Sequence, residues 1–418
     1  MSILSDVLST ILERRYPWQP SREADHRSDA ALIADLLSNA GEISGLTSAR
    51  ELLERYAHKD DAAKIAFFAH LAEELDIDPE TVRSALDAYE AKPGPKSYRA
   101  FLEAAEPPRQ ELVRRLNRVP GATARLVAMR ADLLRLLKRD DPRAALDQDF
   151  RHLFQSWFNR GFLVLRPVSW ESPAQILEKI IAYEAVHAID SWDDLRRRVE
   201  PTDRRCFAFF HPAMPDEPVI FVEVALTRGI PGSIQEVLAE DREEVEAAEA
   251  DTAVFYSISN CQSGLAGISF GNSLIKQVVA DLSAELPGLR TFVTLSPIPG
   301  LRRWMDAEAI DPTTLDDEAL RRTAARYLLT AKREGGMPLD PVARFHLGNG
   351  AQLHAVHANA DISPKGRAES CGAMVNYLYD LGKITQNHEG FAKRQEVAAS
   401  DAVRGLLPRQ GRARKEGA

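Results

Sequence analysis

A glycine-rich loop between Phe255 and Ile275 has a composition suited to binding phosphate. An apolar, strand-like run leads into Gly264, Gly267 and Gly271, and a helix is expected to begin at Ser273. Backbone N–H groups at the start of a helix can bind a phosphate, and glycine permits a close approach. The loop lacks both the lysine of a P-loop and the spacing of a dinucleotide fingerprint. The local pattern fits equally well a turn that only packs a helix on a sheet.

Two further positions carry side chains suited to polar catalysis. Ser296 follows an apolar run and precedes two prolines that fix the chain, so its hydroxyl is well placed to point into a cleft. His346 lies between Phe345 and Leu347, and burial would keep its imidazole neutral near pH 7 and usable as an acid or a base. The short motifs alone do not separate these roles from a turn serine and a hydrogen-bonded core histidine.

The remaining polar candidates are weaker. His354 and His357 are three residues apart on a β-type run, so they are expected on opposite faces, which does not suit a metal pair. Cys261 would suit a thiol hydrolase, but nothing near it in the sequence would lower its pKa. Tyr379 could bring a hydroxyl to a site or only pack. The sequence therefore predicts no metal site.

The first third of the chain reads as helix throughout. Asp78 is expected to cap a helix, and Ser48 with Glu51 has the spacing of a capping box. Apolar residues from Ala122 to Leu136 recur every three or four positions and define one helix face. Acidic residues interleave with the arginines of the bundle, so the arginines of this helix are expected on a solvated face: Arg125, Arg130 and Arg135.

The pattern changes near Asp140, and the rest of the chain reads as α+β. A strand is expected at Phe162–Leu165, and a helix capped by Ser172 follows it. Further β-type runs are Cys206–His211, Val219–Thr227, Ala253–Ser259, Thr291–Leu295 and Gln352–His357, and helices are expected at Ser273–Leu286 and roughly Ser370–Tyr379. We expect an all-α helical bundle over residues 1–145 and an α/β domain over residues 146–418.

Composition limits the class of protein. A chain of 418 residues suggests two domains, and 44% hydrophobic with 28% charged residues is typical of a globular protein. A net charge of −9 gives no electrostatic basis for binding nucleic acid. No apolar run approaches the roughly 20 residues that span a bilayer. The 3 cysteines are widely spaced, which favours a reducing compartment. We expect a cytoplasmic protein with no membrane partner.

Taken together, the segments resemble the malonyl-CoA decarboxylase family. The resemblance rests on their shared order along the catalytic portion, whereas the N-terminal bundle is similar to the family's helical domain mainly in type and position. The segments that carry it are Trp157-Phe158, Gly161–Leu163, Trp170–Pro173, Glu184–His187, Arg197–Val199, Glu217–Thr227, Phe255–Ser259, Gly264–Gly267, Leu274–Lys276, Leu295–Gly300, Phe345–Leu347, Asn349–Ala351 and Ala360-Asp361.

The resemblance implies a fold, a site and a substrate. The fold is a helical bundle followed by a catalytic domain like the GNAT acyltransferases, with a mixed sheet. Ser296 and His346 align with the family's catalytic serine and histidine, and Tyr379 with a tyrosine near the site. The coenzyme A pyrophosphate would lie on an arm of seven residues: Ala266, Gly267, Ile268, Ser269, Phe270, Gly271 and Asn272. At Ser269 some members of the family carry an acid, and this chain has no carboxylate at that position.

The implied reaction converts malonyl-CoA to acetyl-CoA and carbon dioxide without metal, biotin or any other cofactor. The thioester itself accepts the electron pair, so Ser296 would bind the malonyl head and His346 would protonate C2. The family also implies a homo-oligomer, with a tetramer expected through the helical domain. Two alternatives remain: a CoA-dependent acyltransferase of the GNAT type, and a non-catalytic acyl-CoA sensor.

Overall fold

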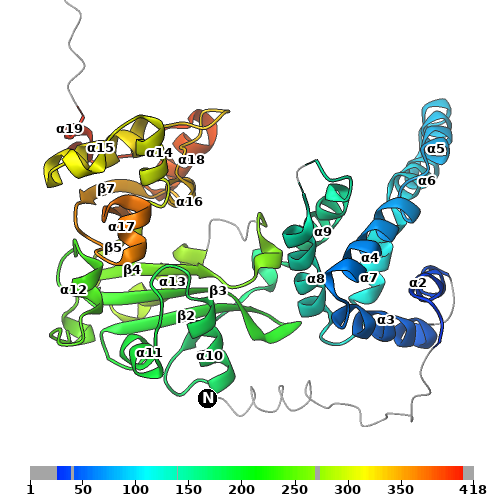
Figure 1. Ribbon diagram of the computed structural model, residues 1–418, viewed down its shortest axis with the longest axis horizontal. Helices are drawn as coiled ribbons and strands as arrows, with labels where there is room; N and C mark the ends of the chain where they lie inside the picture. The colour runs from blue at the N-terminus through cyan, green and yellow to red at the C-terminus, as the bar shows by residue number, and fades with distance from the viewer. Residues whose placement is uncertain (1–25, 39–41, 139, 269–273, 408–418) are drawn as a thin grey trace, which may run out of the picture. The chain divides into compact units, whose positions relative to one another are not determined.

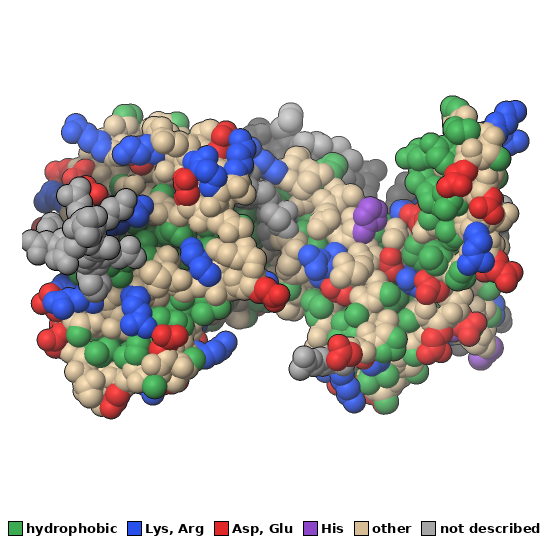
Figure 2. Space-filling view, turned by 90° about the horizontal axis from the view of Figure 1, so that it is seen from above, with side chains coloured by type: hydrophobic (Ala, Val, Ile, Leu, Met, Phe, Trp, Pro, Cys, Tyr) green, Lys and Arg blue, Asp and Glu red, His purple; other side chains and the backbone are tan. Residues whose placement is uncertain are grey.

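The computed structural model describes residues 26–38, 42–138, 140–268 and 274–407. These residues form two compact units. The first contains the described residues up to Leu126 together with Leu136–Leu146, and the second contains Val127–Arg135 and the described residues from Asp147 onward. None of the described helices is both long enough and apolar enough to cross a bilayer. Basic and acidic side chains are mixed over the face seen in Figure 2, in keeping with the net charge of −9.

The first unit is helical, as predicted. Asp78 caps its helix as expected, because the carboxylate accepts hydrogen bonds from the backbone N–H groups of Glu80 and Thr81. The prediction of a capping box at Ser48 was wrong. Ser48 lies inside a helix, is buried, and donates a hydrogen bond to the Asp35 carboxylate at 2.6 Å. The helices are α2 (Asp29–Leu37), α3 (Glu42–Ala57), α4 (Asp61–Glu74), α5 (Pro79–Ala91), α6 (Pro95–Ala105) and α7 (Pro108–Leu116).

Helix α8 (Ala122–Leu136) has the predicted apolar face, and α9 (Ala144–Trp157) follows it. Arg125 and Arg135 are exposed as expected, but the expectation for Arg130 was wrong. Only 1% of Arg130 is exposed, because its guanidinium pairs with Asp147 at 2.8 Å and donates to the Gly264 carbonyl at 2.7 Å. An arginine can be buried when its charge is compensated in this way.

The second unit is built on an eight-stranded mixed sheet, as the α+β prediction required. Among the described strands, β4 and β5 pair in parallel and all other neighbours pair antiparallel. The order is β1-β2-β3-β4-β5-β8-β6, and β7 pairs with β8. The strands are β1 (Val164–Val168), β2 (Arg204–His211), β3 (Met214–Thr227), β4 (Thr252–Asn260), β5 (Thr291–Thr294), β6 (Ser296–Pro297), β7 (Gln352–His357) and β8 (Met374–Leu378).

Helices cover this sheet in groups (Figure 1). The apolar faces of α10 and α11 pack on β1–β3 through a core that includes Ile180, Leu195 and Phe221, and α12 packs beside Val254 of β4. The helices are α10 (Ala174–Tyr183), α11 (Trp192–Val199), α12 (Ile234–Leu238), α13 (Leu274–Glu285), α14 (Leu301–Ala307), α15 (Asp317–Thr330), α16 (Pro341–Gly348), α17 (Pro364–Ser370), α18 (Ile384–Arg394) and α19 (Asp401–Gly405).

Three predicted elements differ in the structure. The strand expected from Phe162 begins at Val164, after a short 3-10 turn. Ser172 does not cap α10, since its hydroxyl accepts from the Ser169 backbone N–H instead. The prediction of a helix over residues 370–379 was wrong, because that stretch contains the end of α17 and then strand β8. Strand β8 lies inside the sheet and is buried on both faces. The apolar residues of such a strand form a continuous run, and their spacing does not distinguish a strand from a buried helix.

We expect Asp147→Ala to lower the free energy of unfolding by about 3–5 kcal/mol, because the buried Arg130 charge would lose its partner. Urea unfolding measured by circular dichroism tests this. The double variant Arg130→Met/Asp147→Ala should recover part of the loss. As a matched control on α8, the helix that carries Arg130, Asp132→Ala breaks the pair with the exposed Arg135 and should cost about 1 kcal/mol or less. Equal costs for both aspartates would contradict the prediction.

Candidate active site

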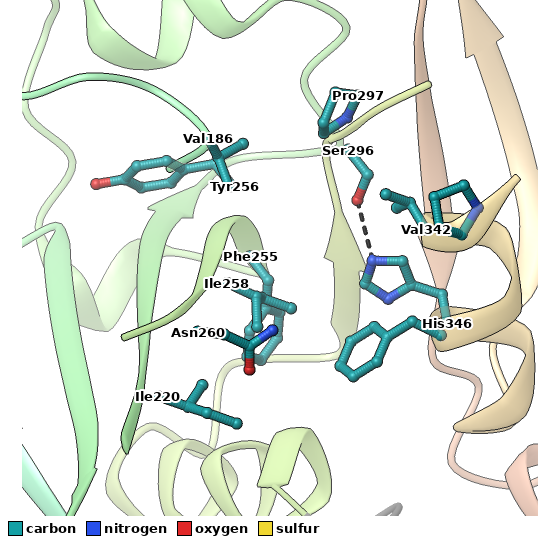
Figure 3. Close-up of a pocket in the computed structure, with 12 residues that line it drawn as sticks. Val186, Ile220, Phe255, Tyr256, Ile258, Asn260, Ser296, Pro297, Val342 and His346 are labelled. Carbon is teal, nitrogen blue, oxygen red and sulfur yellow. Dashed lines mark hydrogen bonds between the residues drawn. The ribbon is translucent and has the colours of Figure 1, made fainter. Parts of the chain in front are cut away.

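A cavity of about 250 Å³ lies beside the sheet in the second unit (Figure 3). Ser296 and His346 stand together on one side of it, and Val186 and Tyr256 lie on the other. Its lining comes from β3, β4, β6, α16 and the segment after α10: Val186, Ile220, Phe255, Tyr256, Ile258, Asn260, Ser296, Pro297, Pro341, Val342, Phe345 and His346.

The cavity exists because two strands part. Strands β4 and β5 pair in parallel as far as Phe255 and Thr294, and the Leu295 N–H still donates to the Phe255 carbonyl at 3.1 Å. Beyond that point β4 runs on to Asn260, whereas Ser296 of β6 pairs with β8 instead. The space between the diverging strands is therefore lined by side chains of both. Ser296 was expected where a strand ends, and the structure places it two residues after the end of β5, as the first residue of β6.

Helix α16 brings His346 to this space. Asp340 caps the helix by accepting from the Ala343 N–H at 2.8 Å, and Pro341 occupies the first turn. His346, near the last residue of the helix, is only 3% exposed. The sequence analysis singled out His346 but did not predict the helix that carries it.

The two side chains are in contact. Ser296 Oγ lies 3.2 Å from His346 Nε2, and the Tyr379 hydroxyl lies 2.8 Å from His346 Nδ1. The ring of Tyr377 stacks on the imidazole, with 4.5 Å between ring centroids and 24° between planes. Both imidazole nitrogens therefore have hydrogen-bond partners, and the ring is held in one orientation.

Burial controls the ionisation of this group. It lowers the pKa of His346 from 6.5 to about 3, because the charged imidazolium would lose its hydration. The same cause raises the pKa of the Tyr379 phenol well above 10. At neutral pH the protein without substrate therefore holds a neutral imidazole beside neutral hydroxyl groups, as the sequence suggested.

The glycine loop lies next to a second hollow, of about 280 Å³, lined by residues from Val219 to Ile268. Ala266 and Gly267 are exposed, and Gly267 has a φ of 73°, which favours glycine. Gly264 serves packing instead, because a Cβ there would lie 1.9 Å from the Val127 carbonyl oxygen. The packing interpretation of the loop therefore holds for Gly264, and phosphate binding at Gly267 stays a prediction. Four residues of the predicted arm lie outside the described residues: Ser269, Phe270, Gly271 and Asn272.

The weaker candidates gain no support from the structure. Cys261 is buried, and burial with the nearby Glu184 charge raises the pKa of its thiol, which opposes activation as a nucleophile. Within the described ranges, no three acidic, histidine or cysteine side chains gather as a metal site. Among those residues, His354 and His357 have no third acidic, histidine or cysteine side chain with which to hold a metal ion.

Sequence reasoning missed one polar neighbour of Ser296. Thr294 is fully buried, and its hydroxyl accepts a hydrogen bond from Ser296 Oγ at 2.8 Å. Residues two apart near the end of a strand lie on the same face, so this spacing was a signal that the sequence offered. The apolar lining from Val186 and Ile220 gave no comparable signal, because it assembles from distant segments.

The low pKa of His346 predicts a pH-dependent stability. The unfolded histidine takes a proton near pH 6.5 and the folded one does not, so its stabilising effect is complete above pH 6.5 and falls as the pH drops toward 3. We expect the unfolding free energy of the wild type, relative to His346→Asn, to fall by up to about 1.4 kcal/mol per pH unit below 6.5. Urea titrations at pH 7.5, 6 and 5 measure it.

Ser296→Ala is the matched control for this experiment. It alters the same hydrogen bond but keeps the histidine, so its pH dependence should follow the wild type. Parallel curves for the wild type and His346→Asn would show that the buried imidazole does not resist protonation.

Comparison with family models and known proteins agrees with this architecture. Residues 75–158 match the model of the malonyl-CoA decarboxylase N-terminal domain, and residues 161–318 and 311–417 match that of its C-terminal domain. The mitochondrial malonyl-CoA decarboxylase of Anser anser anser is 37% identical over 344 residues, covering 70% of this chain and 68% of that protein. The mitochondrial enzyme of Mus musculus is 29% identical over 467 residues, covering 97% and 92%.

Solved structures extend the likeness to three dimensions. The crystal structure of malonyl-CoA decarboxylase from Rhodopseudomonas palustris is 49% identical, with a TM-score of 0.85, and the match covers 90% of this chain and 98% of that one. The enzyme from Agrobacterium vitis is also 49% identical, with a TM-score of 0.86 and coverage of 90% and 99%. The chain therefore belongs to the malonyl-CoA decarboxylase family.

Proposed function

We propose that the cavity between β4 and β6 converts malonyl-CoA to acetyl-CoA and carbon dioxide, using Ser296 and His346. The observation that carries the proposal is the contact of these two side chains, 3.2 Å apart, at a cavity of small-molecule size. Membership of the family supplies the substrate class. The side chains supply the hydrogen bond and the proton that decarboxylation requires.

The thioester makes a cofactor unnecessary for the electron flow. When the bond between C2 and the carboxylate carbon breaks, its electron pair moves onto C2 and the thioester oxygen, and carbon dioxide leaves. The product of this step is an enolate, which needs a hydrogen-bond donor at its oxygen and a proton at C2. The hydroxyl of Ser296 is proposed to bind the malonyl head, and His346 to supply the proton.

The composition of the cavity favours the loss of charge. Among the described residues that line it, none is lysine or arginine, and apolar side chains predominate. A carboxylate in such surroundings is poorly solvated, whereas carbon dioxide and the delocalised enolate are less dependent on solvation. The cavity therefore raises the free energy of the bound malonyl carboxylate more than that of the transition state.

His346 must take up the proton that it donates when the substrate binds. Burial keeps His346 neutral in the free protein, but the malonyl carboxylate brings a negative charge next to the ring. A nearby opposite charge favours the protonated form, so the bound complex takes up one proton from solvent. After carbon dioxide leaves, Nε2 passes that proton to C2 and the ring returns to neutral. One proton is consumed for each acetyl-CoA formed, and the charges balance.

The rest of the proposal concerns binding and assembly. The arm from Ala266 to Asn272 would hold the pyrophosphate of coenzyme A through backbone N–H groups, for which the exposed Gly267 gives room. Tyr379 would hold His346 in orientation. The helical domain of residues 1–145 is proposed to join copies of the chain into a tetramer, and the cytoplasmic location remains a prediction.

The central test measures carbon dioxide and acetyl-CoA released from malonyl-CoA, with EDTA present and no biotin. The wild type should turn over, and Ser296→Ala and His346→Ala should each lose at least about 100-fold in kcat, the scale expected for charge-stabilising and acid–base groups. Ser283→Ala and His354→Ala, which change the same residue types outside the cavity lining, are matched controls and should keep activity.

The alternatives predict different outcomes. Tight binding of malonyl-CoA by the wild type without turnover would contradict the decarboxylase proposal and indicate a sensor. Transfer of an acetyl group from acetyl-CoA to an added amine would instead indicate an acyltransferase.

A further inference from the structure

We propose that Thr294 is a positioning residue that fixes the direction of the hydrogen bonds through Ser296 and His346, so that Nε2 of the imidazole carries a proton. The inference rests on the proposed function, because it explains how His346 is kept ready to protonate C2. It assigns a role to a side chain that lies outside the cavity lining.

The Thr294 hydroxyl accepts a hydrogen bond from each of two neighbours. The side chain is completely buried at the end of β5. Its oxygen accepts from Ser296 Oγ at 2.8 Å and from the backbone N–H of Tyr377 at 3.2 Å. A backbone N–H can only donate, and a hydroxyl oxygen has two lone pairs, so both lone pairs of Thr294 are in use.

This arrangement determines which way the Ser296 proton points. Because Ser296 donates to Thr294, it faces Nε2 of His346 with a lone pair, and Nε2 must carry the hydrogen of the 3.2 Å contact. Nδ1 then accepts from the Tyr379 hydroxyl at 2.8 Å. In the protein without substrate, the hydrogen bonds run in one direction, from tyrosine through histidine and serine to threonine. When the malonyl head binds, Ser296 turns its proton to the substrate, and Nε2 keeps the proton that it passes to C2.

The opposite direction would leave the site unable to donate. If Ser296 turned its proton toward His346, Nε2 would be an acceptor and the neutral ring would carry its proton on Nδ1, away from Ser296. The neutral form with a proton on Nε2 fits all of these contacts, and the imidazolium fits the contact of Nε2 with Ser296, with Nδ1 then donating to the Tyr379 oxygen. Thr294 therefore favours the two forms of the ring that can pass a proton from Nε2.

The same residue also explains the local break in the sheet. Strand β5 meets β8 at Val293 and Leu378, and β6 meets β8 at Ser296 and Val375. Between these pairs, the side chain of Thr294 takes the N–H of Tyr377 that a backbone carbonyl would otherwise accept. The Thr294 carbonyl accepts instead from the Asn376 side chain, at 2.9 Å.

The test compares Thr294→Val, which keeps the shape but removes the hydroxyl, with Thr294→Ser, which keeps the hydroxyl. Proteins labelled with 15N-histidine, without substrate, report the tautomer of each neutral imidazole, and His346→Gln assigns the signal. We expect a proton on Nε2 in the wild type and Thr294→Ser, and on Nδ1 in Thr294→Val. The kcat for carbon dioxide release should fall about 10-fold or more in Thr294→Val, with KM changed less than about 3-fold, and recover in Thr294→Ser.

The matched control is Thr252→Val, which removes another buried threonine hydroxyl from the same sheet, bonded to Asp251. It should change neither the tautomer nor kcat. An unchanged tautomer in Thr294→Val, or an equal loss in Thr294→Ser, would overturn the role of Thr294, since either would indicate damage to packing. A wild type without turnover would contradict the proposed function instead, while the tautomer measurement would still decide the role of Thr294.

Discussion

The site depends on the point at which β4 and β5 stop pairing. The parallel strands pair as far as Phe255 and Thr294 and diverge immediately afterwards. The chain continues from β5 into β6, where Ser296 pairs with β8. The divergence opens the cavity, and it also removes backbone partners that the sheet would otherwise supply. Thr294 and Asn376 replace those partners with side-chain hydrogen bonds. An opening in a sheet must satisfy its freed polar groups, and here the groups that do so are next to the proposed catalytic serine.

Burial gives His346 two properties that suit a decarboxylase. Burial holds the imidazole neutral in the free protein. The buried ring also contacts Tyr379, Ser296 and the stacked Tyr377, so it has little rotational freedom. A solvated histidine would exchange partners with water and change tautomer readily. No lysine or arginine is among the described residues that line the cavity, so the proposed mechanism assigns the ionisation of the ring to the charge of the arriving carboxylate.

The correct and incorrect predictions share a physical explanation. The Asp78 cap and the apolar face of α8 were confirmed because both depend on contacts within one helix. The errors at Ser48, Arg130 and β8 arose where long-range contacts override local pattern. Ser48 bonds to Asp35 from another helix, and the Arg130 charge is compensated by Asp147 and the Gly264 carbonyl. Strand β8 forms because strands on both sides pair with it.

The sequence by itself determined the class of fold, the family and the identity of the candidate residues, because periodicity and motif order are properties of the chain. It singled out Ser296, His346 and the glycine arm, but it left open whether each serves chemistry or packing. Only the tertiary structure placed Ser296 against His346 across 50 residues of sequence, added Thr294 and Tyr379 to the same hydrogen-bond chain, and enclosed them in an apolar cavity. Distances, burial and ionisation depend on which segments meet, and that is decided by the packing of the whole sheet.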